Sequence, residues 1–250
     1  MSITVRPVKF NFDNSIRYYY TDSNFVTHFM NALSSTFPAG ENFFVKSVRR
    51  FRKPIKDELE TNISKFIGQE SYHSLAHKVM NEYAQEHNIP LQTLEKLVER
   101  ALNVVEKNIT PKQCLAVTIA LEHYTACMGS ELQNNPKWLN QLTGKYRELW
   151  DWHSMEELEH KAVAYDVYVR ENFDYATRVS AMVGASIIFW IVIMLMTFWL
   201  MYTDKNMSTF VKIDETIYGL IQIFGFNGFV SNILKDIPIY FRKDFHPNMI

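Results

Sequence analysis

Glutamate and histidine recur together at helical spacing in two separate stretches of the chain. FIGQESYH contains Glu70 and His73, and WDWHSMEELEHKA contains Glu157 and His160. Residues three or four positions apart lie on one face of an α-helix, so each pair can present a carboxylate and an imidazole together. Both groups are ligands for divalent transition metals. The spacing therefore predicts a metal site between two helices.

A third histidine extends the second motif. His153 precedes Glu157 by four positions and His160 by seven. At 3.6 residues per turn, the three side chains occupy about 60° of the helix surface. Neighbouring Glu159 falls on the far side of the helix, and we expect it to face outward. His153 is therefore the third candidate ligand from this stretch.

Two isolated glutamates could complete the site. Glu122 lies alone in the apolar stretch VTIALEHYTACMG, where an unpaired buried carboxylate would be costly unless it binds a cation. Glu41 is the first acid with apolar neighbours upstream of the first motif. Two Glu-x-x-His motifs with one glutamate from each of two further helices form the ligand set of di-iron and di-manganese bundles. The candidate ligands are Glu41, Glu70, His73, Glu122, His153, Glu157 and His160.

Three further side chains are expected behind these ligands. Gln69 and Glu156 stand just before the two motif glutamates. We expect each to hydrogen-bond the histidine four positions later in its own helix and to fix the tautomer of that ring. His77 shares the face of the first motif, and we interpret it as a supporting or core histidine.

The surrounding sequence predicts an all-α fold that brings these residues together. Glycine and proline number eight each, and apolar residues recur every three or four positions. A helix capped by Asp22 or Ser23 is expected to be interrupted around Pro38, with a short helix beginning near Glu41. Thr110-Pro111 is a helix start signal. The further expected helices span 55–87, 91–108, 111–133 and 137–170, and 206–236 is a further helical stretch.

One stretch is apolar enough to cross a membrane. Residues 179–202 contain no charged side chain, and about 20 apolar residues span a bilayer core. The alternative is a buried central helix. We expect three regions: a ferritin-like di-metal helical bundle over 1–178, a transmembrane or membrane-embedded helix over 179–202, and a helical or interfacial tail over 203–250.

Composition limits the function classes and the compartment. The net charge of −1 gives no reason to expect nucleic-acid binding. Cys114 and Cys127 would lie about 20 Å apart on one helix, too far for a disulfide. The first residues lack the apolar core of a signal peptide. We therefore expect the cytoplasmic membrane, with the bundle facing the cytoplasm.

The motifs carry a resemblance to known families. FIGQESYH, WDWHSMEELEHKAVAYDVY and the tail YFRKDFHPN resemble the bacterial family of predicted metal-dependent hydrolases over nearly the whole chain. The ligand order is similar to that of the ferritin-like di-iron carboxylate superfamily. His153, giving His-x-x-x-Glu-x-x-His, resembles the pattern of arylamine N-oxygenases such as p-aminobenzoate N-oxygenase, in which a third histidine joins one iron.

The resemblance implies how the ligands divide. One metal would take Glu41, Glu70 and His73, the other would take Glu122, Glu157 and His160, and His153 would be the extra ligand. Which glutamates bridge is left open.

Our leading functional expectation is a membrane-associated di-iron oxygenase that activates O2 to oxidise a lipophilic small molecule. It would need an electron donor, which the sequence does not identify. One alternative is a two-metal hydrolase that uses iron, manganese or zinc. Another is a non-catalytic iron-binding or ferroxidase module. The sequence is compatible with a homodimer.

Overall fold

Helices make up nearly all regular structure in residues 2–13 and 15–250, the part of the chain that the computed structural model describes. Within that part the only β-pairing is an isolated bridge between Tyr20 and Leu142. The predicted all-α class is therefore confirmed. The helices are α1 (Asn24–Arg49), α2 (Glu58–Glu86), α3 (Leu91–Asn108), α4 (Pro111–Asn134), α5 (Pro136–Asn140), α6 (Gly144–His160), α7 (Val163–Arg170), α8 (Tyr175–Thr203), α9 (Thr209–Phe224), α10 (Phe229–Ile233), and the 3-10 helices η1 (Ile237–Phe241) and η2 (Pro247–Met249).

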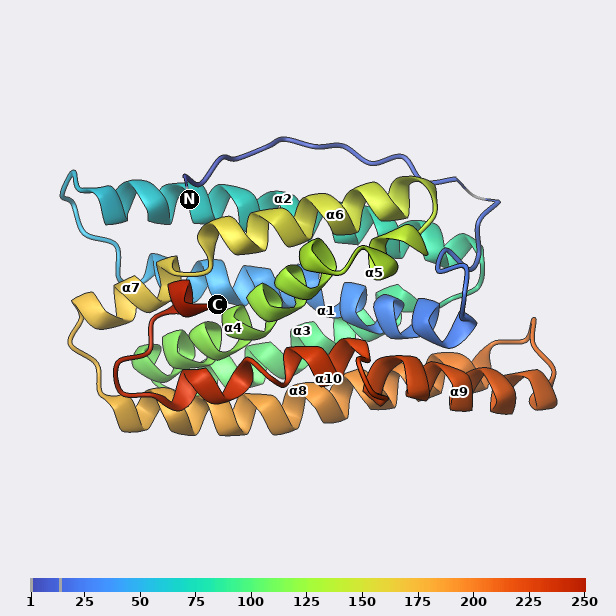
Figure 1. The fold of residues 1–250 in the computed structure, drawn as a ribbon. Coiled ribbons are helices and arrows are strands. Elements are labelled where there is room, and N and C mark those ends of the chain that lie inside the picture. Colours follow the sequence, from blue (N-terminus) through green and yellow to red (C-terminus); the bar gives the residue numbers. More distant parts are fainter. Residues whose placement is uncertain (1, 14) are drawn as a thin grey trace.

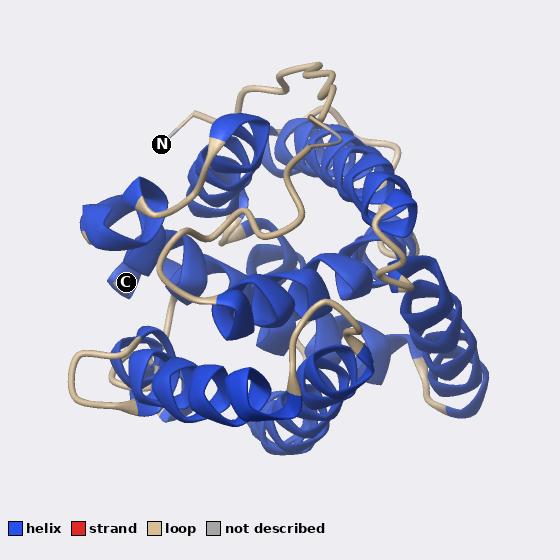
Figure 2. Cartoon of the chain, turned by 90° about the vertical axis from the view of Figure 1, so that its right-hand side faces the viewer, coloured by secondary structure: helices blue, strands red, loops and turns tan. Residues whose placement is uncertain are grey.

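The long helices lie lengthwise beside one another in a bundle (Figure 1). Helix α1 contacts α2, α3 and α8, while α4 contacts α6 and α8. Figure 1 shows α2 and α6 at one edge of the bundle and α8 and α9 at the opposite edge. The view along the bundle shows the same helices joined by loops (Figure 2). Four helices, α1, α2, α4 and α6, can therefore contribute side chains to a common interior.

Side-chain caps fix where the site helices begin. Of the two candidate caps of α1, Asp22 and Ser23, the structure has Ser23, whose side chain accepts a hydrogen bond from the backbone N–H of Val26. Asp57 caps α2 in the same way. Thr110 opens α4 with a capping box in which Gln113 is the reciprocal partner, and Pro111 is the first helical residue. The start signal at Thr110-Pro111 is confirmed.

Helix α1 continues through Pro38, so the predicted interruption there is wrong. Proline has no N–H, which leaves the carbonyl of Ser34 without its helical partner. The side-chain amide of Asn81 donates to that carbonyl at 3.2 Å, and the hydroxyl of Ser74 donates to the carbonyl of Pro38 at 3.1 Å. Two α2 side chains thus support α1 at the point where it carries Glu41 towards the interior.

The expected helix over 137–170 is divided into α5, α6 and α7, so that prediction is also wrong. Gly144 has a positive φ of 51°, a conformation that only glycine adopts without strain. It is the first residue of α6, and residues 141–143 separate it from the end of α5. A turn at Lys161 and Ala162 separates α6 from α7. The second Glu-x-x-His motif consequently lies in the last turn of α6.

An extended N-terminal segment runs along α2 and α6 (Figure 1). The N–H of Thr4 donates to Glu159 at 3.0 Å, and the carbonyl of Thr4 accepts from the amide of Gln69 at 3.1 Å. Arg6 forms ion pairs with Glu156 at 3.0 Å and with Glu159 at 2.6 Å. The expectation that Glu159 faces solvent is wrong because this segment covers and pairs it.

Helix α8 packs lengthwise against α1 and α4, with Phe198 on Phe25 and Trp190 on Tyr124. Two segments, Tyr175–Thr203 and Thr209–Phe241, are long and apolar enough to cross a membrane by length and composition alone. The predicted division of the chain into three regions, with boundaries after residues 178 and 202, stays a prediction. The outward side of α8 carries a row of exposed apolar residues: Val183, Ile187, Ile188, Ile191 and Leu195.

Candidate metal centre

The structure brings together all seven side chains that the motifs single out. They converge inside the bundle, and none is more than 3% exposed. Four helices supply them, because on each helix these residues lie on the face that points into the bundle. Helix α1 contributes Glu41, α2 contributes Glu70 and His73, α4 contributes Glu122, and α6 contributes His153, Glu157 and His160.

Donor atoms of Glu41, His73 and His153 form one group, lying within 4.8 Å of one another. Nε2 of His153 is 3.8 Å from Oε1 of Glu41. The rings of His73 and His153 stack with centroids 4.1 Å apart. This group has the composition of a three-ligand site with two nitrogens and one carboxylate.

Glu70, Glu122 and His160 form a second group within the same limit. Nε2 of His160 lies 3.0 Å from Oε1 of Glu70 and 3.6 Å from Oε2 of Glu122. A third group, Glu70 with His73 and Glu157, overlaps the first two. The donors therefore form one continuous cluster with two ends.

Glu157 lies between those two ends. Its Oε1 is 2.9 Å from Nε2 of His153 and 3.4 Å from Nδ1 of His73, whereas its Oε2 is 3.5 Å from Nε2 of His160. Each oxygen thus faces a different end, which is the arrangement of a bridging carboxylate. The expected division left the bridging glutamates open, and its grouping of Glu70 with His73 recurs in the third group; how the ligands divide between two metals stays a prediction.

The supporting hydrogen bonds cross between helices. Gln69 Oε1 is 2.9 Å from Nδ1 of His160, and Glu156 Oε2 is 3.1 Å from Nε2 of His73. The expected bonds within each helix are wrong, because the side chains of Gln69 and Glu156 reach across to the facing helix. The facing helix supplies the partner instead. The ring nitrogens that remain, Nε2 of His160 and Nδ1 of His73, point into the cluster.

His153 is supported by a chain of buried polar groups. Its Nδ1 is 2.7 Å from Nε2 of His77, whose Nδ1 is 2.9 Å from the hydroxyl of Ser34. That hydroxyl donates to Oδ1 of Asn81 at 2.7 Å, and the amide of Asn81 donates to Glu95 at 3.2 Å. Since Ser34 donates to Asn81, it accepts from His77, and His77 in turn accepts from His153. Nε2 of His153 is then the nitrogen left for a metal.

Sequence reasoning missed Ser34, Asn81 and Glu95, as well as Arg6. Neutral polar residues on an inward helix face have no spacing signature, because serine and asparagine are equally common on outward faces. The only available signal for Ser34 and Asn81 was Pro38, whose missing N–H requires a donor from elsewhere.

Unpaired donor atoms make this cluster a suitable cation site. Both carboxylate oxygens of Glu41, Glu70 and Glu122 are buried and have no hydrogen-bond partner in the part of the chain that the structure describes. The same holds for Nδ1 of His73 and Nε2 of His160. Burying so many unpaired donors is costly unless cations bind them. Four carboxylates and three imidazoles suit two divalent transition-metal ions.

The electrostatics of the cluster point the same way. Burial raises the pKa of Glu41 and of Glu122 well above the ordinary value, and the charges of neighbouring glutamates add to it. Burial also acts to raise the pKa of Glu157, but the charge of His160 and hydrogen bonds from the histidines outweigh it and hold that pKa low. Burial lowers the pKa of His153 to about 4. A neutral imidazole is the form that binds metals.

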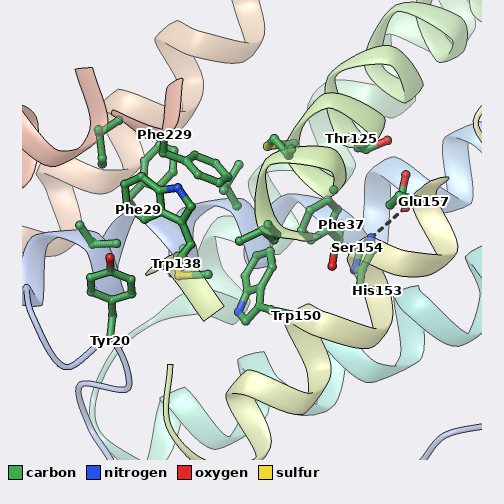
Figure 3. A pocket seen from close by; sticks show the side chains of 17 residues that line it. Tyr20, Phe29, Phe37, Thr125, Trp138, Trp150, His153, Ser154, Glu157 and Phe229 are labelled. Atoms are coloured by element: carbon green, nitrogen blue, oxygen red, sulfur yellow. Dashed lines mark hydrogen bonds and ion pairs between the residues drawn. The ribbon is translucent and has the colours of Figure 1, made fainter. Parts of the chain in front are cut away.

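Two openings reach the cluster from different sides. A polar cleft of about 500 Å³ between α1, α2 and α3 touches Glu70 and carries charged side chains such as Lys78 and Glu99. A narrow apolar pocket between α1, α4 and α6 touches His153 and Glu157 (Figure 3). The first side is polar and borders the buried Glu70, whereas the second side suits an apolar group.

Comparison with known proteins gives a family for this chain. No curated protein and no solved structure matches it. The expected relationships to ferritin-like di-iron proteins and to arylamine N-oxygenases therefore stay predictions. A family model described as predicted metal-dependent hydrolase matches residues 4–250, a range that includes every member of the buried cluster. The chain belongs to the family of predicted metal-dependent hydrolases.

Proposed function

We propose that this protein is a two-metal hydrolase that works at a membrane and cleaves an ester or phosphate ester of an amphiphilic molecule. The observation that carries the proposal is the position of Glu157, whose two oxygens face the two ends of one buried donor cluster. The family to which the chain belongs supports the reaction class.

The proposed ligands divide into two sets. Glu41, His73 and His153 would hold one cation, Glu70, Glu122 and His160 would hold the other, and Glu157 would bridge them. Two such ions would supply Lewis acidity and a water molecule of lowered pKa, and two irons would in addition carry electrons to O2. Iron, manganese and zinc all suit this donor set.

The protein's own residues orient the donors and control access. Gln69, Glu156 and His77 each hold one ligand ring through its outer nitrogen. Phe37 and Trp150 pack against the imidazole of His153 and exclude water from that side. A polar cleft borders Glu70 on the other side of the cluster.

A specific observation favours di-iron oxygen chemistry as a second candidate. The two Glu-x-x-His motifs lie on adjacent antiparallel helices, and each motif histidine is hydrogen-bonded by the other helix. With Glu41 and Glu122 from two further helices, this is the ligand set of di-iron carboxylate bundles. The substrate would then be a lipophilic molecule, and an electron donor would be required.

The membrane belongs to this proposal as well. The outward row of apolar residues on α8 is exposed, while the inner side of α8 packs on α1 and α4. We infer that this outward side contacts lipid of the cytoplasmic membrane, with the metal cluster on the cytoplasmic side. When cells that express the full chain are fractionated, the protein should appear in the membrane pellet. High salt should not extract it from that pellet.

Metal content and metal dependence test the proposed function. The full chain, purified in detergent, is expected to contain two equivalents of divalent metal by elemental analysis. Glu70→Ala and Glu157→Ala should lose metal, whereas Glu148→Ala, an exposed position on α6 paired with Lys145, should keep it. Retention of full metal content by both cluster variants would refute the site.

The choice of reaction follows from the metal that supports turnover. A hydrolase should release alcohol from an acyl ester with redox-inert zinc and without oxygen. Consumption of O2 by the iron-loaded protein only, with no zinc-dependent hydrolysis, would replace the hydrolase with the oxygenase. Oxidation of Fe(II) without any organic product would indicate a ferroxidase module.

A further inference from the structure

Helices enclose the apolar pocket beside the cluster on several sides. It lies between α1, α4 and α6, and α9 and α10 close its far end. Its walls are almost wholly aliphatic and aromatic, including Met30, Leu33, Met128 and Trp150. Such a lining cannot satisfy polar groups, so its occupant must be apolar over most of its length.

Most polar side chains of the pocket lie at one end, and the exception is Tyr20 at the far end. Figure 3 shows Thr125, Ser154, His153 and Glu157 gathered at the first end, with Trp150 between them and the far end. The two cluster members His153 and Glu157 are thus the point at which an occupant can place a polar, reacting group. The rest of the molecule must extend away from the cluster.

The far end adjoins the apolar exterior. Ile223 of α9 and Phe229 of α10 line it, together with Trp138. On the other side of the same helix, Ile221 is 61% exposed, and Phe226 between α9 and α10 is 99% exposed. One layer of protein, the α9–α10 hairpin, therefore separates the pocket from an exposed apolar surface.

The dimensions restrict the shape of the occupant. The cavity volume is about 40 Å³, roughly the room of three water molecules. A longer occupant therefore enters only as lining side chains move aside, and a slender unbranched chain requires less displacement than a fused ring system. Met30 and Met128 are unbranched and flexible, so their rotation can widen the pocket along its length.

We propose that this pocket binds the unbranched alkyl or acyl chain of a single-chain amphiphile drawn from the membrane, with its polar reacting group against His153 and Glu157. The inference rests on the proposed function for the role of that reacting group, and on the pocket alone for the chain. Each further methylene that enters the pocket should raise affinity roughly fourfold until the chain reaches Trp138.

The tryptophans of the pocket report binding directly. An ω-bromo fatty acid carries a bromine quencher at its chain end, so ω-bromododecanoate should quench the fluorescence of Trp138 in a saturable way, and ω-bromohexanoate should reach only as far as Trp150. Trp138→Phe and Trp150→Phe assign the signal. Trp152→Phe is the matched control, because Trp152 packs against Phe10 and His73 outside the pocket.

A larger side chain placed in the pocket should weaken binding of the ligand. Met30→Phe places a larger side chain in the pocket and should weaken ω-bromododecanoate binding by about tenfold or more. Met196→Phe is the matched control, a buried methionine of α8 that does not line the pocket. Thermal unfolding establishes that both variants fold. If Met30→Phe does not fold, the chain-length series on the unmodified protein decides.

The outcomes separate this inference from the proposed function. Saturable quenching that grows with chain length and is lost in Met30→Phe supports the pocket. Absence of saturable quenching in protein that holds two metals, or equal binding by Met30→Phe and the unmodified chain, overturns the pocket and leaves the metal site standing. Quenching by protein that never binds metal overturns the proposed function and leaves the pocket standing.

Discussion

The side-chain oxygen of Gln69 lies 2.9 Å from Nδ1 of His160, a residue of the neighbouring antiparallel helix. The amide nitrogen of Gln69 donates to the carbonyl of Thr4 and to Glu159, so its oxygen must be the atom that faces the ring. The ring then donates from Nδ1 and leaves Nε2 towards Glu70. The N-terminal segment therefore takes part in setting the tautomer of a proposed metal ligand.

Replacing Gln69 should weaken metal binding without removing a ligand. Gln69→Ala is expected to lower metal affinity by roughly 10- to 100-fold, the usual effect of losing a partner behind a ligating histidine. Titration calorimetry of the metal-stripped full chain measures it. Gln85→Ala, at an exposed position of the same helix, should bind as the unmodified chain does. An affinity unchanged by Gln69→Ala would mean that the hydrogen bond does not orient His160.

Removing Glu157 should have a different effect from removing a glutamate at either end of the cluster. Because the two oxygens of Glu157 face different ends, Glu157→Ala should lose both metals. Glu41→Ala and Glu122→Ala should each retain about one equivalent, since each carboxylate belongs to one end only. Elemental analysis after gel filtration gives the stoichiometry. Loss of one metal from Glu157→Ala would show that it does not bridge.

Much of the bundle could be predicted because local signals determine it. Thr110-Pro111 and Pro90 mark helix boundaries through their own chemistry, and α3 and α4 begin where those signals lie. The continuity of α1 through Pro38 could not be predicted, because it depends on a donor from Asn81, a residue distant in sequence. The division of α5 from α6 depends on a positive φ at Gly144, and glycine alone does not indicate which conformation it will adopt.

The candidate site shows the same distinction. Residues at helical spacing, such as Glu70 and His73, could be assigned to one face from the sequence. Which helix supplies the partner of each ring could not, because an intrahelical and an interhelical partner have the same sequence pattern. Arg6 belongs to an extended segment without periodicity, so its ion pairs with α6 had no sequence signal.

The metal-free protein should become less stable as the pH rises above about 6.5. The pKa values of Glu41 and Glu122 are raised in the folded chain by burial, and that of His160 is raised well above 6.5 because Glu157 and Glu70 outweigh its burial. The folded chain then holds protons that the unfolded chain has released, so unfolding becomes easier by up to about 1.4 kcal/mol per pH unit for each group.

His153 acts in the opposite direction at lower pH. Its pKa of about 4, below the ordinary 6.5, adds stability as the pH rises between those two values and nothing above them. Thermal unfolding with a chelator, followed from pH 6.5 upward, isolates the loss. Excess zinc should abolish this loss of stability at higher pH, because the bound cations displace the protons that the folded chain retains. A midpoint independent of pH in the chelated protein would contradict the assigned protonation states.

Gly129 should tolerate no side chain, because α4 and α6 approach closely there. A Cβ at this position would lie 2.7 Å from the backbone carbonyl oxygen of Ser154 and 3.4 Å from Cβ of Glu157. A backbone atom cannot rotate away, so Gly129→Ala should push the helices apart, cost about 1–3 kcal/mol of stability and weaken metal binding through Glu157. Gly184→Ala is the matched control, since a Cβ there meets nothing within 4 Å. The control should keep both its unfolding temperature and its metal content, because alanine also favours the helix. Equal behaviour of the two variants would show that the close contact between α4 and α6 does not position Glu157.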